Sequence, residues 1–151
     1  MKDCIFCKIV RGEIPCCKVY EDEFVLAFLD IAPVNLGHIL VIPKAHHTSS
    51  ATIPEEVAGR MFRAGARLGV AQKRALDAHG YNLHLNDGSV AGQEVMHAHL
   101  HIIPRWTDDQ FHFNWRQLKY SSMEEMQNHC AEIIKSFQFN PAADEKTGDE
   151  E

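Results

Sequence analysis

Three histidines alternate with apolar residues in one short run: His97, His99 and His101, followed by apolar residues up to Pro104. A period of two is the side-chain period of a β-strand, so this spacing predicts that the three imidazoles share one face of a strand. Imidazole titrates near neutral pH, and three together suit proton transfer, nucleophilic attack or metal binding. Histidine is scarce, and an ordinary strand does not require three in register. We therefore interpret them as a functional site rather than a polar strand face.

A second group with chemical potential is the pair Cys4 and Cys7. The Cys-x-x-Cys spacing has three interpretations: a redox pair, two buried thiols, or half of a zinc site. A redox pair belongs at a strand-to-helix junction, whereas here Pro15 follows soon after the pair, which disfavours that interpretation. The five cysteines cannot all pair within one chain, so we expect thiols or metal ligands rather than disulfides.

The elements that must position these groups follow from periodicity and turn residues. The first 45 residues are predicted to be loop and short strands, the strands at 17–21, 24–30 and 38–42. A helix is predicted at 52–79, with Thr52 as its N-cap and a stop at Gly80. Its apolar stripe comprises Val57, Met61, Ala64, Leu68, Ala71 and Leu76. Residues 81–86 and the histidine run predict two further strands, and Ser122 with Glu125 forms a capping box for a helix at 123–137.

Strands and helices in this order predict an α+β protein. We expect a mostly antiparallel sheet of about five strands, with the long helix and the C-terminal helix on one side. The 151 residues are 45% hydrophobic, which is enough for one compact domain, predicted at 1–139.

Charge is concentrated at the end of the chain. Residues 144–151 hold five acidic residues and one lysine, and so account for −4 of the formal net charge of −6. We expect residues 140–151 to be an acidic, disordered tail. The remaining −2 gives no general attraction for nucleic acid polymers.

Targeting signals are not evident in the sequence. No basic segment with an apolar run precedes the cysteine pair, and no segment approaches the roughly 20 apolar residues that span a bilayer. We therefore expect a cytoplasmic protein that does not act at membranes.

Six sequence blocks, in this order, resemble the histidine-triad (HIT) family and most closely its Hint-like bacterial type. The blocks are Cys4-Ile5-Phe6-Cys7, Phe28-Leu29-Asp30, residues 37–44, Asn86-Asp87-Gly88, Gly92-Gln93 and residues 97–104. The resemblance covers about residues 3–105. It implies a HIT-like fold, a homodimer, and a hydrolase or transferase that acts at the α-phosphate of a purine nucleotide conjugate.

The resemblance assigns the catalytic roles to His99, His101 and His97. A neutral imidazole attacks phosphorus at pH 7, and the phosphoramidate that forms is labile enough for water to complete the cycle. By resemblance, His99 forms a nucleotidyl-histidine intermediate and His101 hydrogen-bonds the phosphate. Relatives that transfer the nucleotide to a second substrate carry Gln at the third position, so His101 favours hydrolysis. The leading interpretation from the resemblance is a hydrolase of the nucleoside phosphoramidase type.

Nucleotide contacts are also implied by the resemblance. Asp30 corresponds to the acid that accepts both ribose hydroxyls. The apolar slot around the base corresponds to Ile5, Phe6, Ile9, Phe28 and Ile31, and the phosphate surroundings to Asn86, Gly92, Gln93, Glu94 and Val95. For each apolar residue, ordinary core packing is an equal alternative. Gly92 would let the backbone approach an anion.

A structural zinc is implied by relatives that keep the cysteine pair. In those relatives the remaining ligands correspond to His46 and His97, which with Cys4 and Cys7 complete a tetrahedral set. In the alternative without zinc, His46 and His97 hydrogen-bond each other and the backbone. No organic cofactor is expected.

Two departures from the Hint pattern leave the leaving group open. Glu94 stands where that branch usually has Ser, and Pro104-Arg105 stands where it has a Gly pair. Other functions considered are a dinucleoside polyphosphate hydrolase and a non-catalytic nucleotide-binding scaffold or sensor. A catalytic zinc on the three histidines is disfavoured, because they would spread over about 13 Å of strand.

Overall fold

The structure is a computed structural model that describes residues 3–113 and 115–137, so the predicted tail lies outside the described residues. It divides into two compact units, Met1–Phe111 and residues 112–151. We describe each unit by itself, and the assignment of residues 1–139 to one domain stays a prediction.

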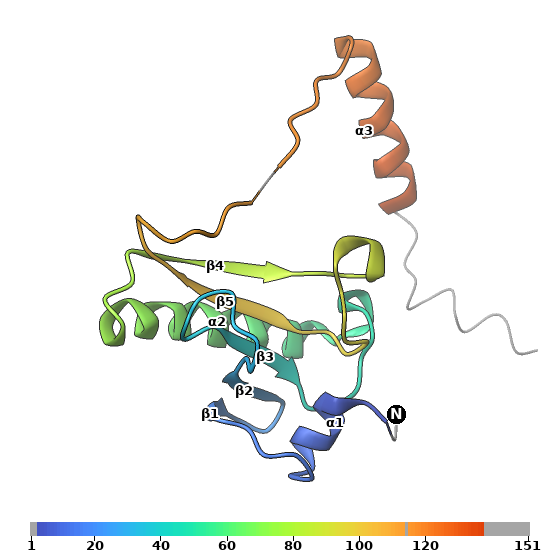
Figure 1. Ribbon diagram of the computed structural model, residues 1–151. Coiled ribbons are helices and arrows are strands. Elements are labelled where there is room, and N and C mark those ends of the chain that lie inside the picture. Colours follow the sequence, from blue (N-terminus) through green and yellow to red (C-terminus); the bar gives the residue numbers. More distant parts are fainter. Residues whose placement is uncertain (1–2, 114, 138–151) are drawn as a thin grey trace, which may run out of the picture. The chain divides into compact units, whose positions relative to one another are not determined.

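The first unit is built on a five-stranded sheet (Figure 1). Its strands are β1 (Lys18–Glu21), β2 (Val25–Leu29), β3 (Ile39–Pro43), β4 (Gly80–Leu85) and β5 (Leu100–Arg105). They lie in the order β1-β2-β3-β5-β4, and every neighbouring pair is antiparallel. The central strands β2 and β3 are almost entirely buried, because their sequences are continuous apolar runs covered on both faces. The α+β prediction with five strands is confirmed.

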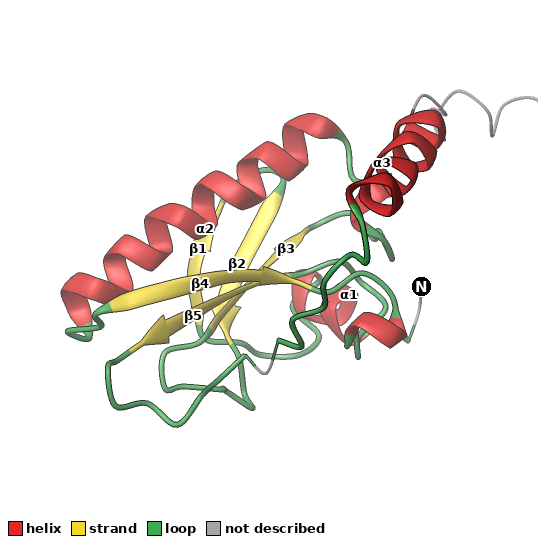
Figure 2. Ribbon diagram, turned by 90° about the horizontal axis from the view of Figure 1, so that it is seen from above, coloured by secondary structure: helices red, strands yellow, loops and turns green. Residues whose placement is uncertain are grey.

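Alternate residues of the central strands face two separate apolar clusters. One cluster joins the sheet to α2 (Glu55–Ala75): Val25, Ala27, Ile39, Val41, Leu100 and Ile102 pack with Met61 and Ala64. The other joins the opposite face to Phe6 of α1 (Ile5–Val10): Leu26, Phe28, Leu40 and Ile42. The two helices therefore cover opposite faces of the sheet (Figure 2). The prediction of loop and strand for the first 45 residues missed α1, because six residues are too short to show a helical period.

Helix α2 is shorter at both ends than predicted. A separate 3₁₀ turn, Ser50–Thr52, precedes it, and Pro54 rather than Thr52 is the N-cap residue of α2. The helix ends at Ala75, followed by Asp77 in a left-handed conformation (φ 53°), so the predicted stop at Gly80 is wrong. Gly65 allows a close approach to the sheet, because a Cβ there would lie 2.7 Å from Cδ1 of Ile102.

The histidine run is not wholly a strand. Strand β5 begins at Leu100, so His97 and His99 lie in the segment that leads into it and only His101 is a strand residue. The predicted strand conformation is therefore wrong for His97 and His99, although both rings pack edge-on against Phe6, at 5.8 Å and 5.3 Å between ring centroids. In this segment the N–H of Ala98 donates to the carbonyl of His47, which is 2.6 Å away and lies outside the strands of the sheet.

The second unit contains α3 (Met123–Phe137), which confirms the predicted C-terminal helix. The hydroxyl of Ser122 accepts from Glu125 N–H at 3.1 Å, as a capping residue does. The Glu125 carboxylate accepts from Ser121 instead of Ser122. The position of α3 on the sheet stays a prediction. Among the described residues, no helix combines the length and apolarity that crossing a bilayer requires.

Candidate functional site

Four side chains from three separate segments meet beside the N-terminus of α1. The Sγ of Cys7 lies 3.2 Å from Nδ1 of His46, and Nδ1 of His97 lies 3.5 Å from Sγ of Cys4 and 3.6 Å from Sγ of Cys7. The four ligand atoms all lie within 4.8 Å of one another. The structure thus brings together the predicted set of two thiols and two imidazoles, although 93 positions separate Cys4 from His97.

The chemistry of this cluster fits a tetrahedral ion. Ligands on a tetrahedral zinc at usual Zn–S and Zn–N distances are separated by about 3.5 Å from sulfur to nitrogen, close to the separations seen here. The Nε2–H of His97 donates to the carbonyl of Pro43 at 2.8 Å, which leaves Nδ1 unprotonated toward the cysteines. A backbone carbonyl that orients a ligating histidine is typical of metal sites. His97 is fully buried, and burial lowers its pKa, which favours the neutral ring.

The next histidine has the opposite tautomer. The Nδ1–H of His99 donates to the carbonyl of His97 at 2.7 Å, so Nε2 of His99 carries the free lone pair. The Phe6 ring packs edge-on against His99 at 5.3 Å and against Phe28 at 5.7 Å between ring centroids. His99 is therefore held in one orientation on the α1 face of the sheet.

His101 forms a hydrogen-bond chain with a residue that sequence analysis did not assign, His38. Val34 N–H donates to Nδ1 of His38 at 3.2 Å, and burial lowers the pKa of His38, so its single proton lies on Nε2. That proton is donated to Nδ1 of His101 at 2.9 Å. Burial, with the neighbouring histidines, lowers the pKa of His101 to about 4, so its own proton lies on Nε2. His101 consequently presents a neutral N–H donor next to His99, whose ring centroid lies 4.8 Å away.

Asp30, His38 and His101 form a second group of polar side chains, and their geometry does not favour a metal ion. The Asp30 carboxylate lies 3.7 Å from Nδ1 of His38, whereas His101 meets Nε2 on another edge of the same ring. Asp30 also accepts the N–H of Ala32 at 2.9 Å. Because the two partners meet different ring nitrogens, and Val34 N–H occupies one of them, these three residues suit hydrogen bonding better than one shared ion.

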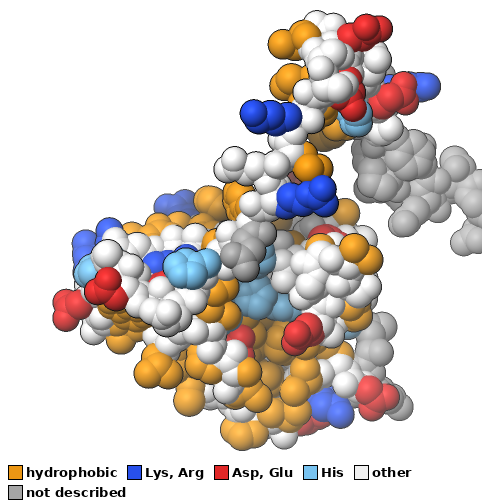
Figure 3. Space-filling view, turned by 45° about the horizontal axis from the view of Figure 1, so that its top comes forward, with side chains coloured by type: hydrophobic (Ala, Val, Ile, Leu, Met, Phe, Trp, Pro, Cys, Tyr) orange, Lys and Arg blue, Asp and Glu red, His pale blue; other side chains and the backbone are white. Residues whose placement is uncertain are grey.

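Sequence reasoning missed two histidines of this face. His38 lies within the block of residues 37–44, and its alternation with Leu40 and Ile42 was the available signal. His84 lies directly opposite His101 in the β4–β5 register, with ring centroids 6.0 Å apart. Its signal was its alternate position between Asn82 and Asn86. Figure 3 shows histidine side chains gathered in a recess on one face, bordered by hydrophobic side chains.

The predicted apolar slot divides into buried and exposed residues. Phe6 and Phe28 are buried in the core cluster, and Ile9 and Val95 pack against it. Ile31 is 96% exposed and Ile5 is 42% exposed. The core alternative therefore describes Phe6 and Phe28 in this structure, while their contact with a base stays a prediction.

The predicted phosphate loop is organised by two side-chain amides. Asn86 donates to the carbonyl of Gly92 at 3.0 Å, and Gly92 has a φ of 91°, which glycine adopts without strain. Gln93 is buried: its oxygen accepts from Gly88 N–H, and its nitrogen donates to the carbonyls of Thr48 and Val95. Gln93 thus shapes the loop through all its polar atoms. Glu94 is exposed.

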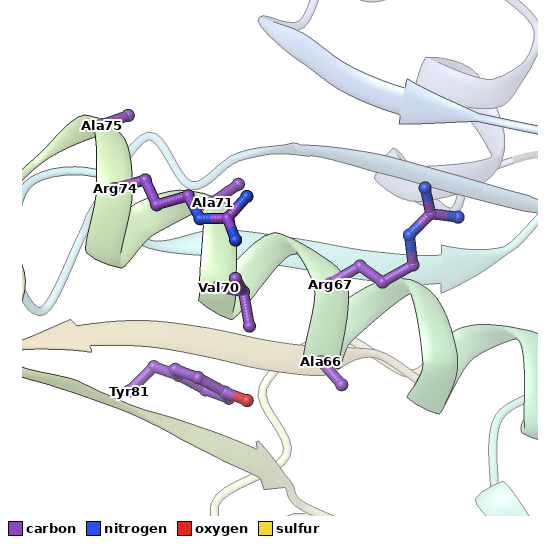
Figure 4. Close-up of a pocket in the computed structure, with 7 residues that line it drawn as sticks. All are labelled: Ala66, Arg67, Val70, Ala71, Arg74, Ala75 and Tyr81. Carbon is purple, nitrogen blue, oxygen red and sulfur yellow. The ribbon is translucent and has the colours of Figure 1, made fainter.

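A separate groove lies where α2 meets β4, lined by helix residues between Ala66 and Ala75 and by Tyr81 of β4 (Figure 4). Arg67 and Arg74 line it from positions about two helical turns apart. The groove contains none of the predicted site residues.

The fold and the histidine site define a HIT protein. The sequence matches the HIT domain family over residues 11–108, and the chain belongs to this family. It is 43% identical over 136 residues to the protein named hit of Bacillus subtilis, a match that covers 89% of this chain and 94% of that protein. A crystal structure of a HIT family member from B. subtilis is similar with a TM-score of 0.82 at 44% identity, covering 88% of this chain and 96% of that one. The resemblance stated from the sequence is confirmed.

Two relatives have names that state an activity. An adenosine 5'-monophosphoramidase of Schizosaccharomyces pombe is 43% identical over 102 residues, 68% of this chain and 74% of that protein. An adenylylsulfatase of Arabidopsis thaliana is 44% identical over 103 residues, 68% of this chain and 52% of that protein. A zinc-bound histidine triad protein from Mycobacterium smegmatis is similar in structure, with a TM-score of 0.71 at 37% identity, covering 89% of this chain and 98% of that one.

Proposed function

We propose that this protein is a nucleotide hydrolase of the nucleoside phosphoramidase type, acting at the α-phosphate of purine nucleotide conjugates. The observation that carries the proposal is the pair of fixed tautomers at the recess. His99 presents an unprotonated Nε2, and His101 beside it presents a neutral Nε2–H. A nucleophile and a hydrogen-bond donor to the same phosphate are the two groups that phosphoryl substitution needs. The two relatives named for hydrolysis of adenylyl conjugates support this substrate class.

The proposed reaction has two substitutions at phosphorus. In the first, Nε2 of His99 forms a bond to the α-phosphorus, and the bond to the leaving amine breaks. The bonding pair stays on the amine nitrogen, which takes a proton from solvent. In the second, the oxygen of a water forms a bond to the phosphorus and the water gives up a proton to solvent. The phosphorus–Nε2 bond breaks and its electron pair returns to Nε2, so one water is consumed per nucleotide released.

The surrounding residues have distinct roles in this proposal. His101 donates from Nε2 to a phosphate oxygen and stabilises the charge that develops there, while His38 fixes the tautomer of His101. His97 orients His99 through its carbonyl, and both of its own ring nitrogens are already engaged. We therefore propose a positioning role for His97 beside the catalytic His99 and His101. Asp30 would accept the ribose hydroxyls.

We propose that Cys4, Cys7, His46 and His97 hold a structural zinc. Four protein ligands leave no open coordination position, so the ion would add folding energy rather than activate water. It would join α1 to the segment before β5 and thereby support the carbonyl that orients His99. The zinc-bound mycobacterial relative supports the choice of metal.

A homodimer and a cytoplasmic location complete the proposal. Strand β4 is the last strand of the sheet order, and an open sheet edge is a natural pairing surface. The apolar stripe of α2, by contrast, packs largely on its own sheet through Met61 and Ala64. Light scattering should give twice the chain mass of 17.1 kDa, and a monomer at micromolar concentration would contradict the dimer.

A substrate panel tests the function. Adenosine 5'-phosphoramidate, adenosine 5'-phosphosulfate and a diadenosine polyphosphate should be compared, each followed by release of adenosine monophosphate. We expect the highest kcat/KM on the phosphoramidate, and rapidly quenched samples should contain protein heavier by one adenylyl group. A preference for the dinucleotide would favour the polyphosphate hydrolase, and mononucleotide binding without any turnover would favour the scaffold or sensor.

A further inference from the structure

One polar side chain interrupts the sheet-facing surface of α2. Gln72 is only 3% exposed, on the same helix that packs Met61 and Ala64 into the apolar core. A buried polar residue on an apolar helix face is unusual, because burial of a polar group costs desolvation free energy that an apolar side chain does not incur.

The contacts of Gln72 supply the reason. Its Nε2 donates to the carbonyl of Gly37 at 2.9 Å and to the carbonyl of Ile102 at 3.0 Å. Carbonyls only accept, so the orientation of the amide is fixed. Gly37 directly precedes His38, and Ile102 directly follows His101. One amide therefore ties together the backbone beside both members of the His38–His101 hydrogen bond.

The backbone lacks an ordinary donor at this point. The β3–β5 register pairs Ile39 with Ile102, and if it continued, Gly37 would oppose Pro104. Proline has no N–H, so the ladder cannot supply a donor to Gly37 from that position. The carbonyl of Pro104 itself accepts from a second side-chain amide, that of Asn35, at 2.8 Å. Side-chain amides thus replace the ladder where the segment carrying His38 meets β5.

The arrangement leaves a buried acceptor unpaired. Among buried side-chain atoms of the described residues, Oε1 of Gln72 has no hydrogen-bond partner. An unpaired acceptor is unfavourable, and a methionine of similar length would avoid it. The residue is therefore explained by the two bonds that its nitrogen donates rather than by packing.

We propose that Gln72 is a positioning residue that holds the His38–His101 hydrogen bond in register from the opposite face of the sheet. Without its two bonds, the chain entering β3 could shift against β5, and His38 would no longer fix the tautomer of His101. The effect on the imidazoles follows from the contacts alone, whereas the effect on turnover rests on the proposed hydrolase function.

The test compares Gln72→Met with Leu68→Ala, a packing control one turn earlier on α2. Nitrogen NMR of histidine-labelled protein reports which ring nitrogen carries the proton. We expect wild type and Leu68→Ala to show His101 protonated at Nε2 alone, and Gln72→Met to show a mixture of tautomers. On the phosphoramidate, Gln72→Met should lower kcat by about tenfold and change KM by less than about twofold.

A double-mutant cycle separates positioning from stability. In a His38→Ala background, Gln72→Met should have almost no further effect on kcat, because the bond it supports is already absent. Gln72→Asn provides a second variant if Gln72→Met does not fold. It keeps the amide, but its shorter side chain cannot reach both carbonyls, so we expect the same mixture of His101 tautomers as for Gln72→Met.

Some outcomes would overturn the proposal. Unchanged histidine signals in a folded Gln72 variant, or additive losses in the double variant, would show that Gln72 contributes only to stability. If the wild type turned over no nucleotide conjugate while the His101 tautomer still depended on Gln72, the positioning role would stand and the hydrolase function would fail.

Discussion

The Nδ1–H of His99 donates to the carbonyl oxygen of His97, 2.7 Å away. The ring of His97 is fixed in turn by the carbonyl of Pro43 and faces the two cysteines. The orientation of the proposed nucleophile is therefore connected, through one backbone carbonyl, to the cysteine and histidine cluster. This relationship explains why a structural ion would influence the reaction without taking part in it.

His99→Ala tests the nucleophile. The variant should lose kcat by about a thousandfold or more, since it removes the imidazole whose Nε2 lone pair makes the proposed attack. Mononucleotide binding, measured by calorimetry, should stay within about threefold of wild type because the ribose and base contacts lie elsewhere. His79→Ala, at an exposed histidine bonded to Thr107, is the matched control. Turnover of His99→Ala within about tenfold of wild type would rule out the covalent route.

Removal of one cysteine tests the metal. Protein purified without added metal should contain about one zinc per chain, and Cys4→Ser should lose it and melt at a lower temperature, because metal binding adds to folding free energy. Cys16→Ser is the control, since Cys16 lies outside the cluster. Activity of Cys4→Ser should survive in part. A chelated protein that stays folded but is wholly inactive would instead indicate a catalytic ion.

Acid should destabilise the fold through its buried histidines. The pKa of His101 falls from the usual 6.5 to about 4 in the folded chain. Between these values the unfolded chain binds a proton that the folded chain does not, so stability is present above pH 6.5 and decreases toward pH 4. The unfolding free energy, measured by denaturant titration, should decrease between pH 7 and pH 5 in both proteins. The decrease should be larger in wild type than in His101→Gln by roughly 1 to 2 kcal/mol. Equal pH dependence in both proteins would contradict the buried neutral ring.

Glu94→Gln tests the departure from the Hint pattern. Glu94 is exposed, and a carboxylate facing the phosphate would be repelled, so we expect it to point away from the substrate. The substitution keeps the shape and removes the charge, and kcat/KM should change by less than about tenfold, or roughly 1.4 kcal/mol. A hundredfold loss with an altered alkaline limb of the pH profile would make Glu94 a general acid.

Short-range patterns explain what could be predicted. The strands β2 and β3 were found because apolar, β-branched runs bounded by turn residues are a local signal, and α3 because its capping serine precedes a periodic segment. The predicted ends of α2 were wrong. The helix is preceded by a 3₁₀ turn at Ser50–Thr52 and followed by Asp77 in a left-handed conformation, and neither feature has a local sequence signal. Helix α1 was missed because its six residues are too few to show a helical period in the sequence, and Phe6 anchors it by packing in the core.

The sequence by itself determined which chemical groups the protein has: three spaced imidazoles, a cysteine pair and the family blocks around them. Only the tertiary structure decided what each group does. An imidazole is a ligand, a nucleophile or a donor according to which ring nitrogen meets a carbonyl, an N–H or another ring. His97 meets Pro43, which is 54 positions away in the chain, and His101 meets His38, which is 63 positions away. The amide of Gln72 likewise meets Gly37, which is 35 positions away. Spacing cannot encode such contacts, because strand pairing and helix packing bring them together.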